Sequence, residues 1–188
     1  MKAITKITIA ALFIGSFALE SCKKGENDPF LSLRSRKARF AGEWTYSAGS
    51  GSNTSGSNTT NWTYDGAVET TTPGNFTDKY TQTYTIEKDG TFTSVYTDNN
   101  TSTAVVTTYT GTWNFLGGVG DVKNKSSVVM HMLTITSGST TVTYTGDNAP
   151  TSIMDIDQLK NKEIIIISKG STSLPASSNE GTMTWTAK

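Results

Sequence analysis

Threonine and aromatic residues alternate along most of this chain, and this alternation limits the possible secondary structure more than any other feature. In residues 78–88 the side chains of Tyr80, Tyr84 and Ile86 alternate with threonines. A period of two places the aromatic residues on one face of a strand, and the branched Cβ of threonine favours a pleated strand over a helix. The same pattern predicts further strands over residues 42–47, 91–97, 104–115, 128–136, 140–159, 163–168 and 182–187.

Short connections join these predicted strands. Asp89-Gly90 separates two alternating segments and is a strong signal for a tight hairpin. Because consecutive strands joined by hairpins are neighbours, the sheet should be antiparallel and meandering. We therefore expect an all-β domain over residues 40–188, an up-and-down barrel of about eight strands with one short N-terminal helix. An immunoglobulin-type sandwich and a membrane-spanning barrel are the weaker alternatives, because a cysteine pair and continuous apolar rows are missing.

The charged and metal-binding side chains exclude several classes of function. Sixteen Lys and Arg balance sixteen Asp and Glu, which removes the electrostatic drive toward nucleic acids. One Cys and one His among 188 residues cannot build an internal disulfide or a common zinc site. We expect no cofactor, no resident metal and no enzymatic activity.

The first 21 residues have the pattern of a secretory signal peptide. Lys2 and Lys6 precede a largely apolar stretch over residues 7–19. That stretch is shorter than the ~20 residues that a membrane-spanning helix needs. The signal predicts export and removal of this segment.

Residues 19–22 resemble the lipobox of bacterial lipoproteins, with Leu19 three places before Cys22 and Ser21 just before it. The resemblance implies cleavage before Cys22 and acylation of this residue, with two or three acyl chains holding the protein to a membrane. Glu20 departs from the usual small residue. The alternative is an ordinary cleavage after Ala18 that leaves Cys22 as a free thiol. Lys23 instead of Asp after the cysteine implies, by the same resemblance, the outer membrane.

Residues 22–39 should form a tether followed by a short helix. Pro29 suits a first helical position, and a basic stretch runs over residues 34–39. This helix could contact acidic phospholipids or a partner, or could simply cap one end of the barrel. The low-complexity segment 49–60 begins a long connection over residues 49–77. It is interpreted as a flap over a cavity mouth, as a loop without function, or as an extra hairpin at the barrel rim.

Several motifs in their order along the chain resemble lipocalin-like lipoproteins of the Bacteroidota. They are Gly42-Glu43-Trp44 after a short helix, the hairpin 86–93, the strand 111–115, and the later pairs Ile156/Leu159 and Ile164/Ile166, together with the tether 24–40. The resemblance implies an eight-stranded barrel closed at one end by the helix. It also implies, only generically, the binding of a small apolar molecule.

The predicted lumen leads to two hypotheses about function. An eight-stranded barrel can either hold one small ligand or be filled by its own side chains. The first hypothesis is a lipid-anchored module that binds a small apolar ligand. Its candidate ligand-binding residues are Tyr84, Phe92, Tyr109 and Trp113. The second is a structural or interaction lipoprotein with a filled core and an envelope protein as its partner. Under both hypotheses we expect a monomer.

Other candidate residues carry weaker signals. His131 is the only histidine and is interpreted as a core or rim residue. Met130 and Met132 are expected to fill core or lumen space, with a copper(I) site as the alternative. Asp155 and Asp157 share a strand face and are expected to point to solvent.

Overall fold

A computed structural model describes residues 27–29, 34–117, 126–173 and 176–188. The predicted signal peptide 1–21 and the predicted lipid-attachment residue Cys22 lie outside these described residues. The elements follow in the order α2 (Arg36–Phe40), β1 (Gly42–Ser55), β2 (Asn58–Tyr64), β3 (Val68–Thr72), β4 (Phe76–Ile86), β5 (Thr91–Asp98), β6 (Val105–Leu116), β7 (Ser127–Ser137), β8 (Thr140–Thr143), the 3₁₀ turn η1 (Gly146–Asn148), β9 (Thr151–Leu159), β10 (Glu163–Ser173) and β11 (Ala176–Ala187).

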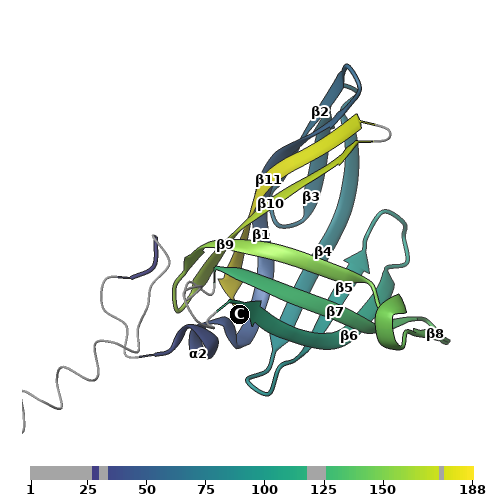
Figure 1. The fold of residues 1–188 in the computed structure, drawn as a ribbon. Helices are drawn as coiled ribbons and strands as arrows, with labels where there is room; N and C mark the ends of the chain where they lie inside the picture. The colour runs from purple at the N-terminus through teal and green to yellow at the C-terminus, as the bar shows by residue number, and fades with distance from the viewer. Residues whose placement is uncertain (1–26, 30–33, 118–125, 174–175) are drawn as a thin grey trace, which may run out of the picture.

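The strands form one antiparallel sheet that closes into a barrel (Figure 1). Consecutive strands pair along the chain except at β8, which is attached to the edge of β7, so that β9 pairs with β7 instead. β1 pairs with β11, and the β6–β7 pairing completes the ring. The predicted antiparallel meander is confirmed. The predicted strand number is wrong, since the barrel has ten strands and not eight.

The two additional strands come from the segment that was predicted to be a long connection. Residues 49–55 continue β1 and pair with β2, and β3 then joins β2 to β4. Closer to α2, residues 42–45 of β1 pair directly with β4. Of the three interpretations of residues 49–77, the extra hairpin matches the structure. These strands extend away from α2 together with β10 and β11 (Figure 1), and we call this part of the barrel the raised strands.

Glycines make this hairpin compatible with an aromatic side chain. Gly51 faces Trp62 across the β1–β2 pair and Gly181 across the β1–β11 pair. A Cβ added at Gly51 or Gly181 would lie 2.8 Å or 2.6 Å from an atom of the Trp62 ring. The indole therefore covers backbone that carries no side chains, which orders a segment whose composition suggests a loop.

The structure does not show the helix that was predicted to begin at Pro29 and to include the basic stretch over residues 34–39. The described helix α2 is one turn long and starts later, at Arg36. Ser35 acts as its N-cap, because its hydroxyl accepts a hydrogen bond from the Ala38 amide at 3.1 Å. Residues 30–33, which belong to the predicted helix, lie outside the described residues.

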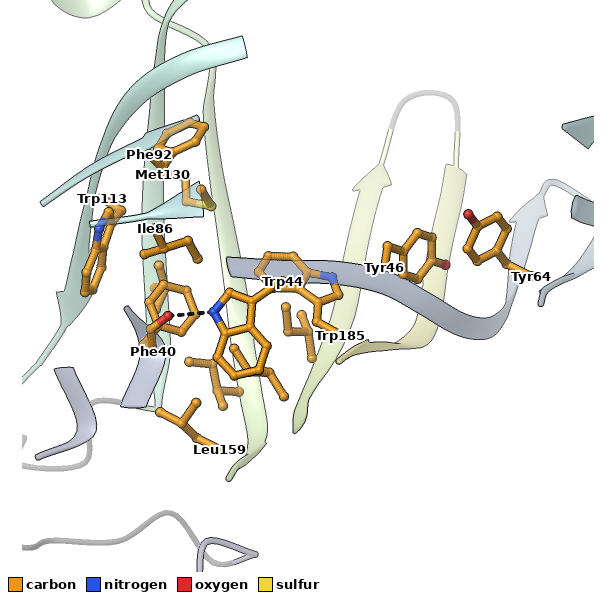
Figure 2. Close-up of a cluster of buried hydrophobic side chains, with 14 of the residues drawn as sticks. Phe40, Trp44, Tyr46, Tyr64, Ile86, Phe92, Trp113, Met130, Leu159 and Trp185 are labelled. Atoms are coloured by element: carbon orange, nitrogen blue, oxygen red, sulfur yellow. Dashed lines mark hydrogen bonds between the residues drawn. The ribbon is translucent and has the colours of Figure 1, made fainter. Parts of the chain in front are cut away.

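Large aromatic side chains fill the end of the barrel next to α2. Phe40 is fully buried and packs against Trp113 with ring centroids 4.8 Å apart. Trp44 donates a hydrogen bond from Nε1 to the Phe40 carbonyl at 2.9 Å, the dashed line in Figure 2. Leu159 and Ile164 are also fully buried in this cluster. This end of the barrel is therefore closed by side chains.

A buried ion cluster holds the segment before α2 against the same end. The carboxylate of Asp28 accepts hydrogen bonds from Arg36 Nε at 3.1 Å and from Arg39 Nη2 at 2.9 Å. Its other oxygen accepts the backbone N–H of Leu159, at the end of β9, at 2.8 Å. Burial lowers the pKa of the Arg36 guanidinium, and the charge of Asp28 opposes that effect. One carboxylate thus joins the N-terminal segment, α2 and the barrel wall.

A stack of tyrosines crosses the opposite part of the interior. Tyr46, Tyr64, Tyr80 and Tyr96 come from β1, β2, β4 and β5, and successive ring centroids lie 4.3, 4.7 and 5.2 Å apart. The Tyr64 hydroxyl donates to the Tyr80 carbonyl at 2.9 Å. Figure 2 shows Tyr46 and Tyr64 pointing toward one another, away from the tryptophan cluster. The stack therefore ties the added hairpin to the rest of the barrel.

Candidate functional site

Between the closed end and the tyrosine stack the barrel contains a cavity of about 330 Å³. Its wall is formed by side chains from five strands, β4, β5, β6, β7 and β9. The lining residues are Gln82, Tyr84, Phe92, Ser94, Tyr96, Tyr109, Met130, Met132, Pro150, Thr151, Ser152 and Met154. Cavities of roughly 300–1,000 Å³ with mostly apolar walls are the usual sites for small molecules.

The opening of this cavity results from the way β10 leaves β9. The β9–β10 pairing ends at Asp155, whereas β10 continues beside β11 as far as Ser173. Residues 151–154 of β9 consequently pair with β7 on one edge, and no strand in the described part of the chain pairs with their other edge. Thr151 and Ser152 are exposed and line the cavity, so this part of its wall meets solvent.

Aromatic rings form one wall of the cavity. Tyr84 belongs to β4, Phe92 and Tyr96 belong to β5, and Tyr109 belongs to β6. Tyr84 is held in place by stacking on Trp185, with ring centroids 4.1 Å apart. Since these strands pair side by side, the alternation of each strand turns its aromatic residues toward the same space.

Methionines form the adjoining part of the wall. Met130 and Met132 are two residues apart on β7, and Met154 lies on the adjacent strand β9. Met130 is buried, while Met132 and Met154 are partly exposed. Figure 2 shows Met130 beside Phe92, where the two walls meet. Unbranched thioether side chains adapt to irregular shapes and make favourable contacts with aromatic rings.

A small hydrogen-bonded group interrupts the apolar wall. Gln82 Nε2 donates to Ser94 Oγ at 3.1 Å, and both side chains lie beside the Tyr84 hydroxyl, where they favour a lower pKa of that group against the larger effect of burial. Ser94 is only 3% exposed. Burial raises the pKa of Tyr84, so its hydroxyl stays protonated and neutral well above neutral pH. The cavity therefore contains a fixed, uncharged polar group.

Three of the four predicted ligand-binding residues lie around this cavity, and the fourth does not. Tyr84, Phe92 and Tyr109 line it, whereas Trp113 lies in the closed end, where its Nε1 donates to the Glu87 carbonyl at 2.9 Å. Trp113 and Tyr109 share a strand face, but four residues of strand place them roughly 13 Å apart along β6. A side chain that faces the barrel interior does not necessarily line the cavity, because its position along the strand determines which part of the interior it reaches.

Sequence reasoning also missed part of the lining. Met154, Gln82 and Ser94 were not singled out, although Gln82 shares its strand face with the predicted residue Tyr84. The period of two was the available signal for Gln82. Met130 and Met132, expected to fill core or lumen space, both line the cavity.

A second, shallower depression lies at the far end of the barrel, on the raised part of β1, β2, β10 and β11. Its lining is mainly serine, threonine, asparagine and glycine, together with Trp62, Ile167, Lys169 and Glu180. This composition lacks the apolar walls that a small apolar molecule requires.

The remaining candidate residues are not brought together into a reactive site. His131 is exposed, and its Nδ1 lies 2.8 Å from the Thr151 hydroxyl. Asp155 is exposed and accepts a hydrogen bond from Ser127, and Asp157 accepts one from Asn27 at 2.9 Å. Within residues 27–29, 34–117, 126–173 and 176–188, no group of three or more His, Cys, Asp and Glu side chains is arranged to hold a metal ion.

No protein-family model matches this chain, and no curated protein matches it. The helices that the structure describes include none with the length and hydropathy needed to cross a bilayer.

Proposed function

We propose that this protein is a binding module that holds one small, largely apolar molecule inside its barrel. The observation that carries the proposal is the cavity of about 330 Å³ between an aromatic and a methionine wall. A barrel filled by its own side chains would leave no such space. The size lies at the lower end of the range for small-molecule sites, which points to a compact ligand.

The proposal includes a lipid anchor at the N-terminus. The chain resembles lipocalin-like lipoproteins, and Cys22 is the acylated residue that the lipobox pattern implies. Acyl chains on Cys22 attach the protein to the outer membrane of a bacterial envelope. Binding, not catalysis, is the function, because the described part of the cavity lining offers hydroxyl, amide and thioether groups but no acid–base pair.

The second candidate function is that of a structural or interaction lipoprotein with an envelope protein as partner. The extended edge of β8 and the raised strands β1, β2 and β3 support it, since both present polar surface to a partner. The cavity favours the first candidate, because an interaction protein has no need of an apolar hollow in its core.

Native mass spectrometry of the protein extracted from its source membrane tests the proposal. We expect a bound species with a mass of a few hundred daltons at most, released by organic solvent. Removal of the cavity by Met132→Trp should abolish that species, whereas the exposed substitution Leu133→Trp on the same strand should not. A spectrum of ligand-free protein under mild conditions in both variants and in the wild type would contradict the proposal.

A further inference from the structure

The charge of the cavity lining limits the ligands that the proposed binding site can accept. Among the residues that the structure describes, those that line the cavity include no Asp, Glu, Lys, Arg or His. Burial is the main cause that raises the pKa of Tyr84 and of Tyr96, so these phenols do not supply a charge at neutral pH either. An ionised ligand would lose its hydration here without gaining a counter-ion, which strongly weakens its binding. The site therefore discriminates against anions and cations.

The shape of the two walls favours a flat ligand. Tyr84, Tyr96 and Tyr109 contribute aromatic surfaces to one part of the cavity wall, and Met130 and Met132 contribute thioethers to the adjoining part. Aromatic rings pack best against other rings in offset or edge-to-face arrangements, and sulfur packs well against ring edges. A planar ring gains both kinds of contact at once. A flexible acyl chain gains neither and loses more conformational entropy on binding.

The size of the cavity limits the number of rings. An apolar cavity of ~150 Å³ holds one benzene ring, so about 330 Å³ holds roughly two fused rings. The hydrogen-bonded pair of Gln82 and Ser94, beside the Tyr84 hydroxyl, then offers a polar contact to one end of the ligand. A ligand without any polar atom would form no hydrogen bond with this group.

From these observations we infer that the cavity selects uncharged, planar ring compounds of one or two fused rings that carry a single hydroxyl or carbonyl group. The inference rests on the proposed function and specifies its ligand class. It assigns Gln82 and Ser94 to the polar end of the ligand and the methionines to its ring face.

Four probes of related size or apolarity test this ligand class by isothermal titration of the full chain in mild detergent at neutral pH. They are 2-naphthol, naphthalene, 2-naphthoate and palmitate. We expect 2-naphthol to bind most tightly and naphthalene to bind roughly 3- to 10-fold more weakly, because it lacks the hydrogen-bonding group. The two anions should bind at least about 100-fold more weakly than 2-naphthol, because each loses hydration without a counter-ion.

Gln82→Leu separates the polar contact from the shape of the site. The substitution should weaken 2-naphthol to about the affinity of naphthalene while leaving naphthalene itself unchanged, a difference that a general loss of structure would not produce. Gln82→Met provides a second variant of similar length. Thr81→Val is the matched control, because the neighbouring residue on β4 points to the opposite face and should leave both affinities unchanged.

The possible results separate the inference from the proposed function. If palmitate or 2-naphthoate binds as tightly as 2-naphthol, the ligand class is wrong while a ligand-binding cavity stands. Equal affinities of 2-naphthol and naphthalene, or equal losses of both in Gln82→Leu, overturn the role of the polar group. Failure of all four probes to bind overturns the inference and counts against the proposed function as well.

Discussion

Asp28 carries an unusual share of the polar interactions at the closed end of the barrel. Its buried carboxylate faces two buried guanidinium groups and one backbone amide, so several partners depend on a single side chain. Removing one member of a buried ion pair typically costs ~3–5 kcal/mol, because the remaining charge stays buried without compensation. This position should therefore be far more sensitive than an exposed ion pair.

Asp28→Asn should lower the free energy of unfolding by about 3–5 kcal/mol, measured by urea denaturation. The amide keeps the shape of the carboxylate but loses the charge that compensates Arg36 and Arg39. Lys160→Gln is the control, because Lys160 forms an exposed ion pair with Glu163 at 3.5 Å. It should change stability by less than about 1 kcal/mol. Equal effects of the two substitutions would contradict the importance of the buried cluster.

Gly111 lies where the β6–β7 register shifts, next to the cavity residue Phe92. A Cβ at this position would lie 2.0 Å from the His131 carbonyl oxygen, which is backbone and cannot rotate away. Gly111→Ala should therefore destabilise the protein by about 2–4 kcal/mol in thermal or urea unfolding. Gly138→Asn should be tolerated within about 0.5 kcal/mol, because this turn residue has φ 58° and open space around it. A harmless Gly111→Ala would show that β6 and β7 do not approach so closely.

At this scale the sequence predicted the aromatic part of the site better than its polar part. Tyr84, Phe92 and Tyr109 follow from alternation, since large apolar residues on the inner face must meet inside the barrel. Alternation places Gln82 and Ser94 on the inner face but gives no reason to select them as site residues, because the role of a polar residue on an inner face depends on the neighbours that form hydrogen bonds with it. The register between β4 and β5 supplies those neighbours, and alternation alone does not determine a register.

At the scale of elements, strands with regular alternation were predictable and the hairpin β2–β3 was not. The Asp89-Gly90 turn joins β4 to β5 as expected, with Gly90 N donating to the Glu87 carbonyl at 3.2 Å. By contrast, residues 49–60 have almost no apolar side chains, so their pattern favoured a loop. They form strands because β1 pairs along one edge with β2 and along the other with β11, and because Trp62 covers the glycines.

The tyrosine stack that joins β1, β2, β4 and β5 should make the fold sensitive to alkali. Burial, as the main cause, raises the pKa of Tyr64 to about 12, compared with an ordinary value near 10. The folded state thus favours the neutral phenol. Its contribution to stability is complete below pH 10 and is lost as the pH rises through about 12.

The free energy of unfolding should accordingly fall between pH 10 and pH 12 more steeply in the wild type than in Tyr64→Phe. Phenylalanine keeps the stacked ring but has no proton to lose, so the difference between the two curves isolates this residue from the titration of lysines. Urea denaturation at fixed pH values measures both curves. Parallel curves over this range would show that Tyr64 titrates normally in the folded protein.

At the scale of the whole molecule, the antiparallel order of the strands could be predicted from the short connections, whereas the number of strands in the barrel could not. The number of strands depends on whether the segment between β1 and β4 joins the sheet, and no local pattern determines this.

The Asp28 cluster also determines which end of the barrel lies near the proposed anchor. Five residues lie between Cys22 and Asp28, and the six steps from one to the other span at most ~22 Å, so an acylated Cys22 would keep the closed end near the membrane. The raised strands would then point away from it.

Cys22→Ala should release the protein from the membrane into the soluble fraction after cell fractionation. The substitution removes the atom to which the proposed acyl chains are attached. A palmitate analogue fed to the cells should label the wild type and leave Cys22→Ala unlabelled. A variant that stays with the membrane, or a wild type without label, would contradict the proposed anchor.

The central claim is that one small molecule binds between the aromatic wall and the methionines. The most direct test is NMR of the full chain with ¹³C-labelled methionine methyl groups in the presence of 2-naphthol. We predict nuclear Overhauser contacts from the ligand ring to the methyls of Met130, Met132 and Met154, and none to Met183, which packs against the core outside the cavity lining. Contacts to Met183 alone, or no contact to any of the four methyls, would contradict the account.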